Sequence, residues 1–343
     1  MTAVQGSMEK NFNLEMMRAV AIYAVVLIHA SMMTFYAAPI DGVAWSITNL
    51  CYSLARFCVP FFFMASAFLL IKEEMPVGAF LKRRLTRILL PLVAWSFIYG
   101  LLNGQDIFSR QWLIGTLLNQ NAAGHLWFLY ALVGLYIMMP LVGLLYYRSR
   151  SLFRWYAALT FVFSCAMPFL NEAFQYRVGF VGNMALDNFH PLVIYLFLPL
   201  LMRDLTFTRQ RGWLALALFG LMTLIIFAGT RHISLAAHQP RETYYNYAYP
   251  PVVIASAALF YLLLNVRFTF SALWRQRILS VAECAFGIYL VHMVFLLLLG
   301  HVINVNVALV WPFGGLIFSV VWFLLTYALV RALRTVPYIR AIL

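Results

Sequence analysis

The stretch MRAVAIYAVVLIHA, residues 17–30, carries two ionisable side chains, Arg18 and His29, inside the first apolar segment of the chain. Such groups are costly inside a membrane helix, so they are usually kept for function. A separation of eleven positions turns an α-helix through about 1100°, or three turns plus roughly 20°. Both side chains therefore point the same way, about 16 Å apart along the axis. This pattern favours a reaction site within a bilayer over a passive anchor.

The rest of the chain is similarly apolar. Of its 343 residues, 64% are hydrophobic and only 10% are charged, whereas a soluble protein is about half apolar and a quarter charged. Recurring runs of about 20 apolar residues predict an all-α, polytopic integral membrane protein. We expect about ten transmembrane helices, over residues 14–36, 45–71, 85–102, 125–147, 152–170, 188–203, 212–230, 248–266, 281–303 and 307–330. The sixth is the weakest, because it is short and carries two prolines.

The net charge of +13 is spread unevenly over the connections. Eighteen of the 24 Lys and Arg residues fall in alternate connections, and only four fall in the others. This asymmetry predicts a multi-pass protein with both termini in the cytoplasm, which requires an even number of spans. It also accounts for the charge without nucleic acid as a partner, since no basic face stands apart from these loops.

A single membrane domain over residues 10–343 is expected. Residues 1–9 form a short tail in which MTAVQGSM resembles an expression leader, with the native start at Met8. No metal site is expected, because the cysteines are scattered through apolar segments without metal-ligand spacing. They are interpreted as packing residues: Cys51, Cys58, Cys165 and Cys284.

Several ionisable residues need partners within the expected spans. Glu15 and Arg18 are an i,i+3 pair and can neutralise each other. Arg18 can alternatively snorkel to the inner surface, with His29 satisfying a helix contact. Arg56 lies deep in the second span and needs a partner or a water-filled cavity.

A basic block, Lys82 to Arg87, stands at the inner end of the third span. Arg84 and Arg87 are i,i+3, so they share a helix face and can bind one polyanion together. The alternative is ordinary positive-inside anchoring.

Two later elements carry histidine beside aromatic residues. His125 and Trp127 stand at the outer start of the fourth span, where Trp127 alone would suit an interfacial belt. Tyr289 and His292 are i,i+3 in the ninth span, whereas Glu283 faces away from His292.

The polar, aromatic segment 231–251 either lines an entrance for a polar substrate or forms an interfacial tyrosine belt. The remaining histidines are expected to be solvated near the outer side: His190, His232, His238 and His301.

Together these elements resemble membrane-bound acyltransferase family 3 over nearly all of residues 10–330. In chain order they read Glu15-x-x-Arg18-Ala19 with His29; Arg56 followed by Val59-Pro60-Phe-Phe-Phe-Met-Ala-Ser66-Ala67; Arg84-x-x-Arg87; His125-x-Trp127-Phe-Leu129; and Tyr289-x-x-His292. The chain departs from the family pattern where Glu15 replaces Asp, where Ala19 and Ala67 replace Gly, and where Ala285 stands for a common Ser.

The resemblance implies a ten-helix bundle in the bacterial inner membrane. It implies an O-acetyltransferase similar to those acting on surface polysaccharides such as enterobacterial common antigen. Acetyl-CoA would be the donor, and a cell-envelope glycan or lipid-linked sugar the acceptor. The acyl group could instead be succinyl, and a homo-oligomer is compatible with this interpretation.

The resemblance also assigns roles to residues. His29 would be the general base. The implied catalytic residues are His29, Arg18, Glu15 and His125. The residues implied to bind acetyl-CoA are Arg84, Arg87, Arg83 and Arg56. The residues implied to bind or support the substrate are Trp127, Tyr289, His292 and Ser66.

Two other classes of function stay open at this point. A transporter or flippase of a lipid-linked sugar or polysaccharide would also use a polar cavity and a buried arginine. A sensory or scaffold module would not need Arg18 and His29 on one face.

Overall fold

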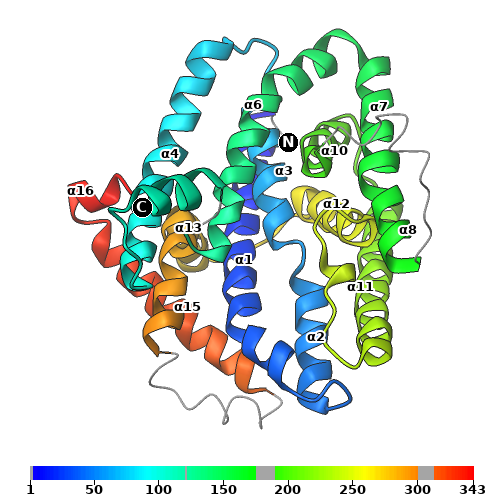
Figure 1. Ribbon diagram of the computed structural model, residues 1–343. Coiled ribbons are helices and arrows are strands. Elements are labelled where there is room, and N and C mark those ends of the chain that lie inside the picture. Colours follow the sequence, from blue (N-terminus) through cyan, green and yellow to red (C-terminus); the bar gives the residue numbers. More distant parts are fainter. Residues whose placement is uncertain (1–2, 120–121, 175–189, 300–312) are drawn as a thin grey trace.

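The computed structural model describes residues 3–119, 122–174, 190–299 and 313–343, and these residues form helices without any strand (Figure 1). In chain order the elements are α1 Ala3–Ala37, α2 Val43–Ala55, α3 Cys58–Leu70, α4 Val77–Leu102, α5 Arg110–Trp112, η1 Leu113–Asn119, η2 Gly124–Leu126, α6 Trp127–Arg148, α7 Arg150–Leu159, η3 Thr160–Ala166, α8 Met167–Phe174, η4 Pro191–Val193, α10 Ile194–Arg203, α11 Arg209–Ala237, η5 Thr243–Tyr245, α12 Pro250–Asn265, α13 Ala272–Leu299, α15 Gly314–Leu333 and α16 Pro337–Arg340. The letter η marks 3₁₀ or π turns.

Nine helical stretches of the described residues are long and apolar enough to cross a membrane, which confirms the predicted all-α, polytopic fold. The sixth expected span, 188–203, is the exception, because its apolar helix covers only Pro191–Arg203. Thirteen residues of α-helix reach about 20 Å, well short of a bilayer core of about 30 Å. The expected even number of crossings therefore depends on this short helix.

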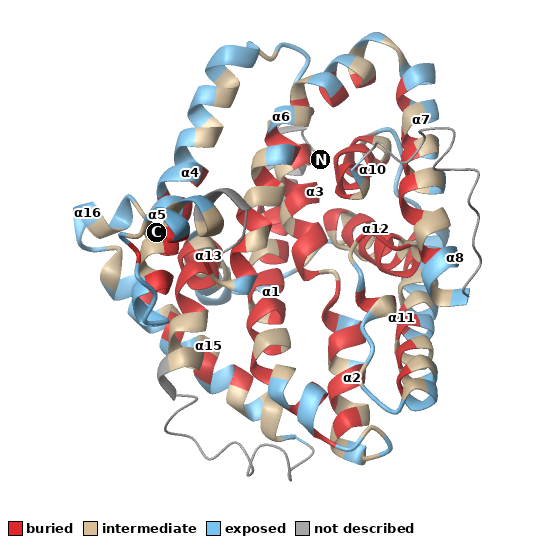
Figure 2. Cartoon of the chain, viewed as in Figure 1, coloured by how far each residue is buried: buried red, intermediate tan, exposed pale blue. Residues whose placement is uncertain are grey.

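Helix α1 runs through the middle of the bundle (Figure 1). It packs against α2, α3, α12, α13 and α15. Its side chains are buried on several faces, including Met17, Ala21, Ile22 and Val26. A helix that is apolar all round belongs in a core, and Figure 2 shows the buried residues gathered on the central helices.

The outer helices expose large apolar side chains. On α11 these include Trp213, Leu214, Leu221 and Leu224. An apolar face of this extent is unusual on a soluble protein. It fits contact with lipid, in agreement with the polytopic fold.

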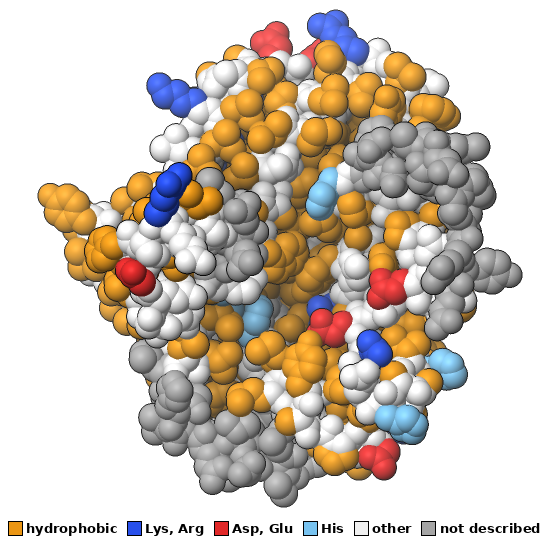
Figure 3. Space-filling model, in the orientation of Figure 1, with side chains coloured by type: hydrophobic (Ala, Val, Ile, Leu, Met, Phe, Trp, Pro, Cys, Tyr) orange, Lys and Arg blue, Asp and Glu red, His pale blue; other side chains and the backbone are white. Residues whose placement is uncertain are grey.

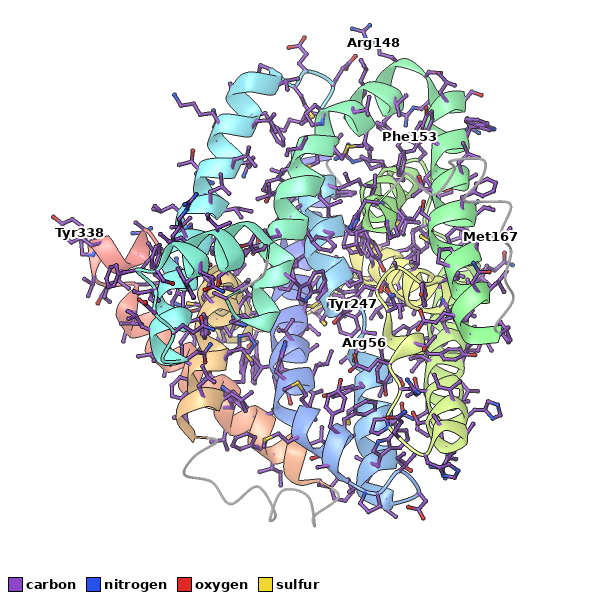
Figure 4. All side chains as sticks on the ribbon, viewed as in Figure 1. Arg56, Arg148, Phe153, Met167, Tyr247 and Tyr338 are labelled. Atoms are coloured by element: carbon purple, nitrogen blue, oxygen red, sulfur yellow. The ribbon has the colours of Figure 1, made fainter. Side chains whose placement is uncertain are left out.

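The second expected span, 45–71, is broken into α2 and α3 at Arg56 and Phe57. Helix α3 restarts at once, since the Phe57 carbonyl accepts a hydrogen bond from the Phe61 N–H at 3.0 Å. Pro60 lies in the first turn of α3, where its missing N–H costs nothing. The break places Arg56 on a short irregular segment in the middle of the bundle (Figure 4).

One end of the bundle carries the basic connections. The α3–α4 connection and Arg148, at the end of α6, lie at this same end (Figures 1 and 4). Arg203 of α10 donates to the carbonyls of Phe68 and Ile71, and so caps the end of α3. That this end faces the cytoplasm stays a prediction from charge.

Some expected boundaries differ from the structure. Helix α13 begins at Ala272, nine residues before the expected 281, because its first turns are helical but polar. The backbone of residues 3–9 continues α1, and their interpretation as a leader stays a prediction. Residues 307–312 of the tenth expected span lie outside the described residues, as do Arg177, Asp187 and His301.

Candidate active site

A cavity of about 1070 Å³ lies among α1, α3, α4, α6, α13 and the segment before α12. Figure 3 shows this face hollowed at its centre, with mainly hydrophobic side chains around a few charged and histidine side chains. Arg18, Arg84 and Arg87 line one part, which we call the basic mouth. Glu172, Arg241 and Glu242 line another, which we call the outer mouth.

The two mouths lie at opposite ends of the cavity. Tyr36, near the end of α1, donates a hydrogen bond to Glu242 at 2.7 Å. Arg18 is eighteen residues earlier on the same helix, a rise of about 27 Å. The cavity therefore extends along most of α1, and both Arg18 and His29 line it, as their spacing predicts.

Three arginines from two helices form the basic mouth. Arg18 donates from Nη1 to both carboxylate oxygens of Glu15, at 2.8 and 3.1 Å, which confirms the predicted pair. Arg84 and Arg87 are one turn apart on α4, and the buried Nε of Arg84 has no hydrogen-bond partner among the described residues. Arg83 is exposed and does not line the cavity, because it projects from another face of α4.

Three histidines from distant parts of the chain meet near the middle of the cavity, where His29 and His125 line its wall and His292 lies behind them. Nδ1 of His29 lies 3.4 Å from Nε2 of His292, and the two ring centres are 4.9 Å apart. The ring of His125 lies 5.3 Å from that of His292. Helices α1 and α13 and the η2 turn supply these side chains, and His125 and His292 are buried.

The backbone carbonyls around the histidines determine which ring nitrogens carry hydrogen. Nδ1 of His29 lies 2.8 Å from the Val25 carbonyl, and Nδ1 of His292 lies 2.7 Å from the Tyr289 carbonyl. Carbonyls only accept, so each neutral ring carries its hydrogen on Nδ1. Nε2 of His292 then faces His29 as an acceptor. No described residue bonds to Nε2 of His29, whose lone pair is left to accept a proton.

The backbones of the other two histidines are held in place by aromatic donors. The Tyr289 hydroxyl donates to the His125 carbonyl at 2.6 Å, and Trp322 Nε1 donates to the His292 carbonyl at 2.9 Å. The side chain of His125 is different, because both of its ring nitrogens are buried without a partner among the described residues. Buried polar groups normally have partners, so this ring is available to a ligand.

Arg56 lies among tyrosines. Its guanidinium carbon is 5.1, 4.1 and 5.5 Å from the ring centres of Tyr52, Tyr245 and Tyr247. Figure 4 shows Arg56 and Tyr247 side by side. The resemblance groups Arg56 with Arg84 and Arg87, but the structure places it against the outer segment, because the break after α2 turns it there.

The segment 231–251 is divided by the structure. Its first residues end α11, whereas residues 241–247 supply six side chains to the cavity wall. Glu172 fixes the segment by accepting hydrogen bonds from Thr243, at 2.7 Å, and from Tyr249. The geometry supports the entrance interpretation over the tyrosine belt. Sequence reasoning missed Glu172, since a lone acid at the end of a span carries no signal of its partners.

Nine of the twelve site residues expected from the sequence line this cavity: Arg18, His29, Arg56, Ser66, Arg84, Arg87, His125, Trp127 and Tyr289. Glu15, Arg83 and His292 do not. Glu15 pairs with Arg18 and His292 contacts His29, so these two act on the site through a neighbour. His190, His232 and His238 are exposed, as expected.

Fold and site together define a multi-pass membrane protein with a histidine-centred cavity between two polar mouths. A comparison with protein-family models matches residues 11–329 to the acyltransferase domain of acyltransferase family 3. The chain belongs to this family and is a membrane acyltransferase. Searches among curated proteins and among solved structures gave no significant match.

Proposed function

We propose that this membrane acyltransferase is an O-acetyltransferase that uses cytoplasmic acetyl-CoA to modify a hydroxyl of a cell-envelope glycan or lipid-linked sugar, in the bacterial inner membrane. One observation carries the proposal: His29 presents a ring nitrogen that has no partner among the described residues, in a cavity that joins the basic mouth to the outer mouth. Donor and acceptor can therefore reach one base from opposite sides.

The basic mouth suits the phosphates of acetyl-CoA. Guanidinium groups bind phosphate through paired, charge-assisted hydrogen bonds. Arg84 retains an unpartnered Nε, and Arg87 lies one turn away on the same wall. Arg18 is partly neutralised by Glu15, so it adds less net charge and stands between the phosphates and His29.

The chemical step that we propose is a direct acyl transfer. Nε2 of His29 takes the proton from the acceptor hydroxyl while that oxygen attacks the thioester carbonyl. The new C–O ester bond forms, the C–S bond breaks, and the proton passes from His29 to the departing CoA thiolate. In this proposal the ring of His125, whose nitrogens have no hydrogen-bond partner among the described residues, donates a hydrogen bond to the developing oxyanion.

His292 positions His29 in this scheme. Its Nε2 faces the Nδ1–H of His29, which helps to hold the tautomer that leaves Nε2 of His29 unprotonated. A neighbour that holds a catalytic side chain usually affects the reaction rate through the orientation of that side chain. No atom of His292 lines the cavity.

The direct test is transfer of a radiolabelled acetyl group from acetyl-CoA to envelope glycan by the purified protein. Mass spectrometry of glycan from cells with and without the protein should show a gain of one acetyl group. A gain of one succinyl group would reassign the donor. No transfer, together with movement of a lipid-linked sugar across vesicles, would instead favour the transporter alternative.

A further inference from the structure

Arg56 is a buried cation that has no carboxylate partner among the residues that the structure describes. It is 7% exposed and lines the cavity, and its Nε has no hydrogen-bond partner among the described residues. The two ion pairs of the described part of the chain join Arg18 to Glu15 and Arg150 to Asp204, so neither involves it. A guanidinium this deep in a membrane protein requires an anion, a dipole or water.

The surrounding protein meets that requirement only in part. The faces of Tyr52, Tyr245 and Tyr247 attract the guanidinium through cation–π contacts. Among the described residues, the N–H donors of the guanidinium have the Tyr247 hydroxyl as a hydrogen-bond partner but no carboxylate at ion-pair distance. Glu242, on the same outer segment, binds the Tyr36 hydroxyl at 2.7 Å. Glu242 is near enough to attract Arg56 through space but forms no ion pair with it, so Arg56 stays charged and lines the cavity.

The helix break strengthens this positive region. Helix α3 starts immediately after Arg56 and Phe57, and its first residues, Cys58 and Val59, line the same cavity. The N-terminus of a helix carries a partial positive charge and unpaired N–H groups. Broken membrane helices place such ends beside anionic substrate groups.

Other features of the outer half fit a sugar. Trp127 and Tyr247 are stacked, with ring centres 5.9 Å apart and planes 26° from parallel. Aromatic faces beside polar groups suit the apolar faces of a pyranose ring. Glu172 and Glu242, at the mouth, are acceptors for hydroxyl groups.

We propose that the outer half of the cavity is an acceptor subsite for an acidic sugar, whose carboxylate or phosphate oxygens bind Arg56 while the ring lies against Trp127 and Tyr247. This inference rests on the proposed function and narrows its acceptor to sugars that carry a negative charge. It removes Arg56 from the donor site that the resemblance implies.

Binding can be measured without the acyl donor. Glucose, glucuronate and glucose 1-phosphate share one ring and differ in their anionic group, so calorimetry with the protein in nanodiscs compares them directly. At least one acidic sugar should bind tenfold or more tightly than glucose, and the better one identifies carboxylate or phosphate. Equal binding of all three, or none, would overturn the proposal.

Variants assign the effect to Arg56. Arg56→Gln should reduce the preference for the acidic sugar at least tenfold, and Arg56→Lys should keep part of it. Arg231→Gln is the matched control, because Arg231 binds Ser46 and does not line the cavity. A preference that survives in Arg56→Gln would refute the subsite.

Acetyl-CoA affinity separates the two proposals. Arg56→Gln should bind acetyl-CoA with the affinity of the wild type. Weaker acetyl-CoA binding by this variant would show that Arg56 belongs to the donor site or has a structural role. If an acidic sugar binds but no acetyl group is transferred, the result supports the acceptor subsite and contradicts the proposed function. If acetyl transfer proceeds equally well to neutral and acidic sugars, the result supports the proposed function and contradicts the acidic-sugar subsite.

Discussion

The basic mouth and the outer half of the cavity both contain arginine, but in different settings. Arg18, Arg84 and Arg87 stand on regular helices and are half-buried or exposed. Arg56 stands at a helix break, is 7% exposed and is enclosed by three tyrosines. Solvated, grouped cations suit a polyanion whose phosphates stay near water, whereas one enclosed cation suits one specific anionic group. This difference supports our proposal that donor and acceptor bind at opposite ends of the cavity.

The largest effect should come from the point where the two regions meet. His29→Ala removes the proposed base, and general-base catalysis typically contributes 10²–10⁴-fold. We expect kcat for acetyl transfer to fall about a thousandfold while acetyl-CoA still binds. His232→Ala, which changes an exposed histidine of α11, is the control. Normal turnover by purified His29→Ala would remove His29 from the chemical step.

The next effect tests the basic mouth alone. Replacing Arg84 and Arg87 together by Ala should weaken acetyl-CoA binding roughly 10- to 100-fold, because each guanidinium–phosphate contact is charge-assisted. Calorimetry at two salt concentrations should also show a smaller salt dependence. Lys82→Ala removes a nearby charge that does not line the cavity, and it should change little. Unchanged acetyl-CoA affinity in the double variant would mean that Arg84 and Arg87 only help to set the orientation of the helix in the membrane.

A smaller effect is expected at His292. His292→Gln replaces the neighbour that faces Nδ1 of His29. We expect kcat to fall about tenfold with KM for acetyl-CoA unchanged, since orientation is lost and binding is not. A rise in KM with kcat unchanged would show that His292 shapes the donor site instead.

The last prediction concerns stability rather than activity and tests the outer wall. A Cβ on Gly229 would meet the Tyr244 ring at 2.4 Å, whereas a Cβ on Gly220, on the same helix, meets nothing within 4 Å. Gly229→Ala should therefore lower the free energy of unfolding by about 1–3 kcal/mol, and Gly220→Ala should be neutral or slightly stabilising. Thermal unfolding in detergent compares the pair. Equal melting temperatures of the two variants would show that the segment around Tyr244 moves aside without a cost in stability.

Local spacing predicted much of this molecule. The periodicity of residues 17–30 placed Arg18 and His29 on one face, and the i,i+3 spacing of Glu15 and Arg18 gave their ion pair. Arg84 and Arg87 were likewise predicted to share a face. Each of these relations lies within one helix, where the helical geometry alone fixes which side chains are neighbours.

Relations between helices could not be predicted from spacing. His292 contacts His29 across 263 positions of the chain, and Thr243 binds Glu172 across 71. The direction of Arg56 depends on the break after Ala55, in a mainly apolar stretch that gives no helix-end signal beyond Pro60. Arg83 was expected in the acetyl-CoA site because it belongs to the basic block Lys82 to Arg87. Its side chain nevertheless does not line the cavity.

We propose above all that one path joins a donor at the basic mouth to an acceptor at the outer mouth, with His29 between them. Oriented proteoliposomes test it most directly, with labelled acetyl-CoA supplied only at the basic-mouth side and an acidic-sugar acceptor only at the other. We expect label on the acceptor with the wild type and none with His29→Ala. Transfer that occurs only when donor and acceptor share one side would contradict the path.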